Sequence, residues 1–207
     1  MAPRDLYRIL AAAVAPRPIC FAATVDAAGR ANLSPYSFFN VVSVDPPLLA
    51  FSPLLGGRNG GRRKDTLNNV LAVPEVSINV VEYDFVERMN QTSAAYPPGV
   101  NEFTEAGLTE APSQTIRPPR VAESRVSFEC TVDRVLHLGD GPLAGNLVLA
   151  RIQHVHLHPD LLDADGELDP ARLDLVGRLG GSDYVRATAA ARFALTKPGY
   201  SPPGSGD

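Results

Sequence analysis

The sequence predicts a mainly β protein that folds as a closed or nearly closed barrel. Short apolar or alternating segments recur along the 207 residues and are separated by turns rich in Pro, Gly and Asp. Helical patterns are few and short. Six or more strands at this spacing favour a barrel over a sheet of strand–helix–strand units, because such units need a helix between successive strands.

The first eighty residues are expected to contain two short helices and five strands. The first helix should cover 5–14, where Pro16 and Pro18 stop it, and the second should cover 66–71. A turn at 26–29 should join the first two strands, and the break at 45–47 should separate the next two. The expected strands are 19–25, 31–37, 41–44, 48–52 and 76–81.

Residues 82–120 differ in character and predict an insertion or lid. They combine a helix expected over 84–95 with several prolines and little strand pattern, and an insertion of this length in a compact domain is usually functional or disordered. Two long strands should follow at 125–138 and 147–157. A single domain over 1–197 is expected, and the polar Pro/Gly/Ser tail at 198–207 need not fold.

Composition argues against nucleic acid and membranes as the main partners. The net charge of −4 and the pI of about 5.6 argue against nucleic acid or an anionic membrane. No run of roughly 20 apolar residues is present, so no transmembrane span is expected. Cys20 and Cys130 lie inside apolar runs, which predicts buried free thiols in a reducing compartment. We therefore expect a cytoplasmic protein.

The segment after the strand at 48–52 could hold a phosphate. Asp65 is placed to cap a helix over 66–71, and a helix start presents unpaired N–H groups that attract an anion. Lys64 and a neighbouring arginine would add charge, and Ser52 and Thr66 would add hydroxyl donors. A solvated basic turn before a capped helix is the alternative interpretation.

Residues 32–40 could line a flat ring that forms hydrogen bonds. In a strand, Ser34, Tyr36 and Phe38 would point one way, and the residues between them the other. Pro35 lacks a backbone donor, which places a gap in the ladder as at a sheet edge or bulge. Free backbone and hydroxyl groups near apolar surface suit a flavin. A barrel strand with an aromatic core is the alternative.

Two further patterns are less specific. His154, His156 and His158 would share one strand face; a polar outer face explains them better than a metal site, since no Cys or carboxylate cluster joins them. The segment 178–184 combines an arginine, two glycines and a tyrosine, so it could approach a ligand closely or form a plain turn. No metal site is expected.

Taken together, these segments resemble the flavin reductase-like family, whose fold is the FMN-binding split barrel. The resemblance covers about residues 12–197. Each piece is short, but the ordered set is specific. The segments that carry it are Pro16–Ile19, Asn32–Phe39, Asp45–Pro47, Phe51-Ser52, Lys64–Thr66 with Asn69, Arg178–Gly181 with Tyr184, and, within the insertion, Glu87–Ser93, Asn101–Phe103, Gly107-Leu108 and Pro118–Arg120.

The resemblance implies a split β-barrel with a few peripheral helices. It also implies a homodimer that binds FMN, or alternatively FAD, in a groove at the subunit interface. The strand at 32–38 would line the isoalloxazine, the segments at 52 and 64–66 would hold the phosphate, and residues near 178–184 would close the site. The implied cofactor-binding residues are Asn32, Ser34, Pro35, Tyr36, Ser37, Phe38, Ser52, Arg63, Lys64, Asp65, Thr66, Asn69, Arg178 and Tyr184.

The function that the resemblance implies is NAD(P)H-dependent flavin reduction. The cofactors carry the hydride chemistry, so no catalytic acid or base is expected. A separate oxygenase could consume the reduced flavin. Two alternatives stay open: an FMN protein of the same fold that reduces another organic or metal acceptor, and a non-enzymatic carrier of flavin or haem. The glycine-rich stretch at 56–61 leaves open which of Arg62, Arg63 and Lys64 reaches the phosphate.

Overall fold

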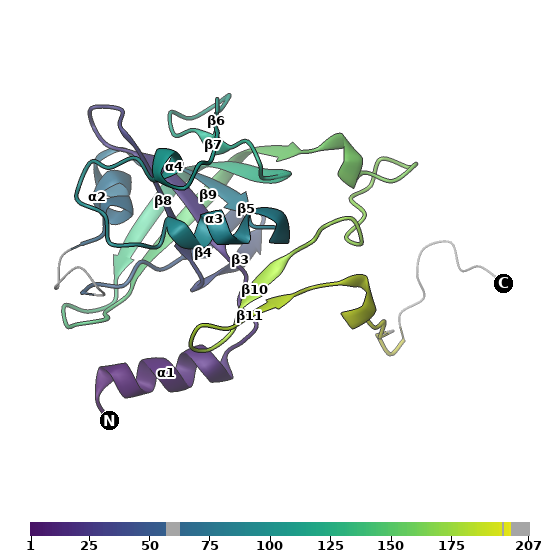
Figure 1. The fold of residues 1–207 in the computed structure, drawn as a ribbon, viewed down its shortest axis with the longest axis horizontal. Coiled ribbons are helices and arrows are strands. Elements are labelled where there is room, and N and C mark those ends of the chain that lie inside the picture. The colour runs from purple at the N-terminus through teal and green to yellow at the C-terminus, as the bar shows by residue number, and fades with distance from the viewer. Residues whose placement is uncertain (57–62, 196, 200–207) are drawn as a thin grey trace.

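The computed structural model describes residues 1–56, 63–195 and 197–199, and it shows a mainly β split barrel (Figure 1). One antiparallel sheet of seven strands has the order β2-β1-β5-β8-β9-β4-β3. The glycine-rich stretch lies mostly outside the described residues, and so does the tail from residue 200 onward. The seven strands are β1 (Cys20–Val25), β2 (Ala31–Tyr36), β3 (Phe39–Val44), β4 (Pro47–Phe51), β5 (Glu75–Val80), β8 (Val126–His137) and β9 (Asn146–Leu157).

Smaller elements surround this sheet. Two hairpins pair β6 with β7 and β10 with β11. In Figure 1 the helix α1 lies outside the barrel, next to the β10–β11 hairpin. The bounds are α1 (Pro3–Ala13), α2 (Asp65–Ala72), η1 (Tyr83–Phe85), α3 (Val86–Gln91), α4 (Glu102–Glu105), β6 (Glu110–Ala111), β7 (Arg120–Val121), η2 (Pro159–Leu161), β10 (Val176–Arg178), β11 (Tyr184–Arg186) and η3 (Ala189–Ala191).

The split in the barrel falls between β2 and β3, the two edges of the sheet. These edge strands follow each other in the chain, because β2 ends at Tyr36 and β3 begins at Phe39. The chain therefore passes from one edge of the sheet to the other across Ser37 and Phe38. Pro35 lies on the edge strand β2 and pairs with Phe21 of β1, which confirms the predicted sheet-edge position. Because Pro35 has no backbone N–H, the donor that it lacks is on the open side of β2, where no strand pairs.

Two apolar clusters occupy the two faces of the central strands. Alternation along β1 sends Cys20 and Ala22 into one cluster and Phe21 and Ala23 into the other. The first cluster gathers side chains from β4, β5, β8 and β9 together with helix α2, so it fills the barrel. The second lies under the segment 82–121, whose Phe85, Met89, Phe103, Leu108 and Val121 are all buried against the outer face. Both cysteines are buried free thiols, as predicted.

Several boundaries differ from the sequence expectation. Helix α2 starts at Asp65 itself, and Lys64 occupies the cap position without a side-chain cap bond, so the prediction of Asp65 as the cap was wrong. The helix expected over 84–95 is a 3₁₀ turn followed by α3, which ends at Gln91. Strand β2 stops at Tyr36, so strand alternation does not extend to Phe38.

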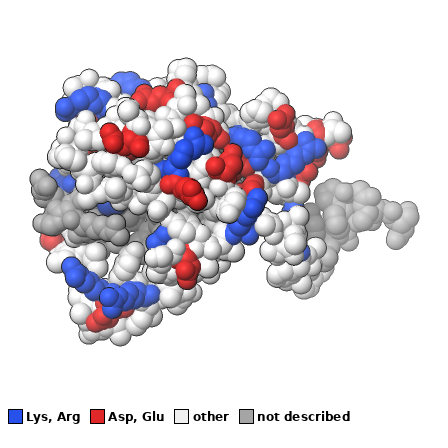
Figure 2. Space-filling model, in the orientation of Figure 1, with Lys and Arg blue, Asp and Glu red and all other residues white. Residues whose placement is uncertain are grey.

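The surface carries charges of both signs. Lys and Arg lie among Asp and Glu over much of the face shown in Figure 2, with wide uncharged areas between them. None of the helices in the described ranges combines the length and hydropathy that a membrane crossing requires.

Candidate functional site

The end of β2 meets the start of α2 at an aromatic side chain. The Lys64 ammonium lies 4.8 Å from the centroid of the Tyr36 ring, and that ring lies 5.5 Å from the ring of Phe51. Within the described residues, the Tyr36 hydroxyl is the buried side-chain polar atom that has no hydrogen-bond partner. Burial raises the pKa of Tyr36 against the smaller, opposing effect of the neighbouring Thr66 and Ser34 hydroxyls, so the phenol keeps its proton. An unused donor therefore lies beside the cationic start of the helix.

The link between β2 and β3 continues the site. Arg17 Nε donates to the Ser37 hydroxyl at 3.3 Å, and its guanidinium carbon lies 5.9 Å from the centroid of the Phe38 ring. The Ser52 N–H donates to the Phe38 carbonyl at 2.9 Å, which ties the end of β4 to this link. The Tyr7 ring on α1 lies 6.1 Å from Phe38. Polar and aromatic groups from four elements thus meet where the barrel is split.

The β10–β11 hairpin is joined to this region through Arg17. The backbones of Arg17 and Arg178 exchange hydrogen bonds of 2.9 and 2.8 Å. The Arg178 guanidinium lies 4.4 Å from the centroid of the Tyr184 ring and donates to the Gly181 carbonyl at 2.6 Å. The Tyr184 hydroxyl donates to Asn90 Oδ1 on α3 at 3.4 Å. The segment 178–184 is therefore a hairpin beside the link rather than an isolated turn.

Three predicted site residues belong to a buried hydrogen-bond network. Thr66 Oγ1 donates to Asn32 Oδ1 at 2.8 Å, and Asn69 Nδ2 donates to Thr24 Oγ1 at 3.0 Å. Asn32 Nδ2 in turn donates to the carboxylate of Glu102 at 2.7 Å. The hydroxyl proton of Thr66 is therefore committed within the protein. These side chains hold β2 against α2, and their direct contact with a ligand stays a prediction.

The remaining predicted residues border the same region. Ser34 is half-buried on β2 and shares the inner face with Tyr36, as their register partners Ala22 and Cys20 show. Asp65 is half-buried in the first turn of α2, and Arg63 is exposed. The Ser52 hydroxyl lies against Gly145 of the β8–β9 hairpin, where a Cβ atom would come within 2.8 Å of it.

Two residues that the sequence argument did not assign are central to this geometry. Arg17 joins α1, the β2–β3 link and the β10 hairpin, and Glu102 joins the insertion to β2. Both are charged residues that the fold buries. Their partners lie up to 162 positions away in the chain, so neither spacing nor local pattern marks them. Only their places in the Pro16–Ile19 and Asn101–Phe103 segments could have drawn attention to them.

The arrangement fits a flavin phosphate and ring in chemical terms. Lys64, the first N–H groups of α2 and the Ser52 hydroxyl are donors of the kind that phosphate requires. The Tyr36 phenol is an unsatisfied donor close to them. Phe38 offers apolar contact beside the open edge of β2, where the Leu33 N–H is already bound by Glu102. The residues present thus fit the group that the sequence suggested.

The histidines do not gather ligands around themselves. His156 Nε2 lies 2.6 Å from Glu129 Oε1, and the His154 and His156 rings stack edge-on at 4.5 Å. Glu129 also accepts from Gln114 and Thr115, so the pair anchors the end of the insertion. Across the described ranges, no three His, Cys, Asp or Glu side chains are grouped as a metal would require.

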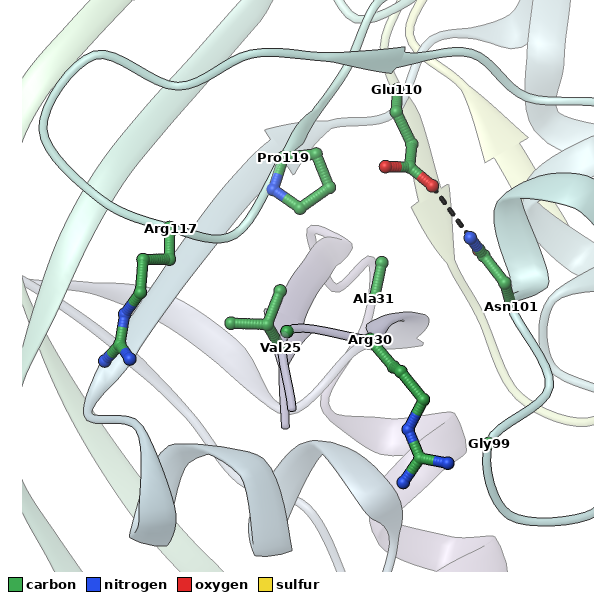
Figure 3. A pocket seen from close by; sticks show the side chains of 9 residues that line it. Val25, Arg30, Ala31, Gly99, Asn101, Glu110, Arg117 and Pro119 are labelled. Carbon is green, nitrogen blue, oxygen red and sulfur yellow. Dashed lines mark hydrogen bonds between the residues drawn. The ribbon is translucent and has the colours of Figure 1, made fainter. Parts of the chain in front are cut away.

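A separate pocket lies at the β1–β2 hairpin, as Figure 3 shows. Its volume is about 370 Å³, and Arg30, Asn101, Glu110 and Arg117 are among the residues that line it. Both arginines are paired, Arg30 with Asp26 at 2.6 Å and Arg117 with Glu75 at 3.0 Å. Asn101 donates to Glu110 at 2.7 Å. These charged and amide side chains thus already have partners, two of them outside the pocket lining, and none of the predicted site residues lines it.

Comparison with known proteins agrees with this fold. A family model described as "Flavin reductase like domain" matches residues 13–172. The uncharacterized protein BH2278 of Halalkalibacterium halodurans is 38% identical over 200 residues, which cover 96% of this chain and 93% of that protein.

Two solved structures are similar over most of their length. The crystal structure of nitrilotriacetate monooxygenase component B from Bacillus cereus has a TM-score of 0.86 at 31% identity and covers 94% of this chain and 95% of its own. That of the 2-nitrobenzoate 2-nitroreductase NbaA from Pseudomonas fluorescens has a TM-score of 0.84 at 27% identity, with 99% and 96% covered. The match of the family model over most of the chain shows that this protein belongs to the flavin reductase-like family.

Proposed function

We propose that this protein is an NAD(P)H-dependent flavin reductase that binds FMN at the split between β2 and β3. The single observation that carries the proposal is the line of donors and cations along this split. It begins with Lys64 beside the buried Tyr36 phenol, continues at Ser37 with Arg17, and ends at Arg178. Such a line offers charge for a phosphate at one end and polar groups for a ring along its length.

The chain's own groups would bind and orient the two cofactors. When bound, a flavin would accept a hydride from the nicotinamide of NAD(P)H, and the nicotinamide would leave oxidised. Lys64 and the start of α2 would hold the phosphate, and Phe38 would offer an apolar surface for the ring. The Tyr36 phenol would donate a hydrogen bond without giving up its proton, since burial raises its pKa. FAD is the alternative flavin.

We expect the active form to be a cytoplasmic homodimer. Leu6, Tyr7, Ile9 and Leu10 on α1 are exposed, and so is strand β3 around Val42. Exposed apolar surface next to a site is typical of a subunit interface, and closed two-fold pairing is the commonest oligomer. The contact of Tyr7 with Phe38 places this surface beside the proposed flavin groove. Sedimentation that finds a flavin-loaded monomer at micromolar concentration would contradict the dimer.

The segment 82–120 is proposed to narrow access for the nicotinamide or the final acceptor. The contact of Tyr184 with Asn90 brings its helix α3 to the hairpin that flanks the site. Replacing only the stretch 94–99, which is exposed except for the half-buried Tyr96, by a short glycine linker would spare Glu102. We expect the Michaelis constant for nicotinamide or acceptor to change while FMN affinity stays within about twofold. If this variant loses its dimer but keeps its substrate kinetics, the segment 82–120 is an arm of the subunit interface instead.

A second candidate keeps the FMN bound and passes its electrons to another acceptor. The likeness to a 2-nitrobenzoate 2-nitroreductase favours testing a nitroaromatic acid, and the likeness to a monooxygenase component favours a partner oxygenase. NAD(P)H oxidation measured with and without added free flavin, and then with 2-nitrobenzoate, separates these cases. Turnover that requires free flavin supports the reductase, and turnover with 2-nitrobenzoate alone supports the second candidate.

A further inference from the structure

Arg17 is a buried cation that only neutral groups satisfy. The residue is 7% exposed. Its Nη1 donates to the carbonyl oxygens of Ala11 and Val14, its Nη2 donates to that of Leu179 at 3.0 Å, and its Nε donates to the Ser37 hydroxyl. In the described part of the chain, none of its hydrogen-bond acceptors is a carboxylate. Buried charges are normally paired, so this one is held at a cost in folding free energy.

A second cation stands directly opposite. Arg17 and Arg178 form an antiparallel bridge with reciprocal backbone hydrogen bonds, which sends the two side chains to the same face. Like charges placed opposite each other are destabilising. Arg178 is satisfied by the Gly181 carbonyl and the face of Tyr184, and again no carboxylate of the described chain joins it. Two positive charges therefore face each other without a counter-ion.

The position of this pair indicates what it is for. Arg17 binds Ser37 and lies over Phe38, which are the residues that bridge the split and border the proposed flavin site. An unneutralised charge is useful where negative charge develops during a reaction, because it needs no rearrangement at that moment. Hydride transfer from neutral dihydronicotinamide moves two electrons and one proton, so it leaves the nicotinamide positive and places one negative charge on the flavin.

We propose that the Arg17–Arg178 pair, which would act through its charge, sets the reduction potential of the bound flavin by stabilising its reduced, anionic form over the oxidised, neutral form. This inference rests on the proposed function. Arg17 also acts as a positioning residue, because it holds the Ser37 hydroxyl, the end of α1 and the β10–β11 hairpin in place. The charge and the positioning roles are separable by substitution, since lysine keeps the charge and loses the planar fork.

The test is the midpoint potential of FMN bound to the full-length protein, measured by equilibration with a reference dye. It is compared between the native protein and the variants Arg17→Met, Arg17→Lys and Arg178→Met. Arg120→Met is the matched control, because Arg120 also donates only to a backbone carbonyl, that of Pro112, outside the site. We expect Arg17→Met and Arg178→Met to weaken the preference for reduced over oxidised FMN about tenfold, which lowers the two-electron potential by about 30 mV. Arg17→Lys and Arg120→Met should stay near the native value.

Other outcomes would overturn the proposal in distinct ways. Native potentials in both methionine variants, with FMN bound, would contradict it. Native potentials with a raised Michaelis constant for NAD(P)H would assign the pair to the nicotinamide pyrophosphate instead. If Arg17→Met does not fold, Arg178→Met decides, because the hydrogen bond and the ring contact of the Arg178 side chain lie within its own hairpin. A native protein that binds no flavin would remove the proposed function and this inference together.

Discussion

The carboxylate of Glu102 in the insertion accepts a hydrogen bond from the side-chain amide of Asn32 on β2, at 2.7 Å. Its other oxygen accepts from the backbone N–H of Leu33 at 2.9 Å, a donor on the open edge of the sheet. Asn32 also accepts from Thr66 on α2. One buried acid thus joins the insertion, the strand that lines the proposed site and the helix that would bind the phosphate.

Glu102→Gln should destabilise the fold and weaken flavin binding. The carboxylate serves two donors, whereas a glutamine oxygen can serve one and its amide group would oppose the other. An unsatisfied buried donor costs about 1–3 kcal/mol. Chemical denaturation and an FMN titration check this, with Glu105→Gln on the exposed side of the same helix as control. Equal stability and affinity in the two variants would contradict the role given to Glu102.

Lys64→Ala should weaken FMN binding roughly tenfold to a hundredfold. A charge-assisted hydrogen bond contributes about 1.5–3 kcal/mol, which corresponds to that range of affinity. Arg63→Ala should have a smaller effect, because Arg63 is exposed while Lys64 lies over the Tyr36 ring. Flavin fluorescence quenching measures both affinities. The phosphate assignment fails if Lys64→Ala binds FMN as the native protein does while remaining folded.

Gly145→Ala should displace the Ser52 hydroxyl. The added Cβ atom would come within 2.8 Å of Ser52 Oγ, closer than such atoms approach, and the hydroxyl can move by rotation about χ1. If Ser52 contacts the phosphate, FMN affinity should fall by about as much as in Ser52→Ala, and the double variant should show little further loss. Gly141→Ala, on the same hairpin with open space around its Cα, is the control. Additive losses would show that Ser52 and Gly145 act independently.

Glu129 should make stability depend on pH in acid. Burial acts to raise its pKa, but hydrogen bonds from Thr115, His156 and Gln114 lower it to about 2. A carboxyl whose pKa is lower in the folded than in the unfolded protein stabilises the fold when the pH is above the unfolded pKa, which is near 4.5. This contribution to the free energy of unfolding is lost as the pH falls toward 2. At 1.36 kcal/mol per pKa unit the contribution is on the order of 3 kcal/mol.

Glu129→Gln imitates the protonated carboxyl and provides the test. The difference in free energy of unfolding between the native protein and Glu129→Gln should be largest near neutral pH and should shrink between about pH 4.5 and pH 2. Urea denaturation at a series of pH values measures it. A difference that stays constant over this interval would mean that the variant acts through packing and not through the charge.

The barrel could be predicted from the sequence because its strands are locally encoded. Alternation in β8, the turns around β1 and β2, and Pro35 at an edge are properties of neighbouring residues. The basic start of α2 could likewise be predicted, since Lys64 and α2 are adjacent in the chain. The capping role of Asp65 was misjudged because Asp can occupy either the cap or the first helical position, and both are favourable next to the helix dipole.

Long-range buried charge could not be predicted in the same way. Glu102 reaches Asn32 across 70 positions, and Arg17 reaches Leu179 across 162. In the sequence each looks like a surface residue, because charged side chains are rarely buried without an ionic partner. Their burial follows only from the topology, which brings the insertion to the edge of β2 and the C-terminal hairpin to the end of α1.

The measurement that tests the account most directly is a titration of the full-length protein with FMN, followed by NAD(P)H oxidation with the same sample. The account predicts saturable quenching of flavin fluorescence with one FMN per chain, weakened at least tenfold by Lys64→Ala, and oxidation of NAD(P)H that depends on flavin. A folded protein that neither binds FMN or FAD at micromolar concentration nor oxidises NAD(P)H in their presence would contradict it.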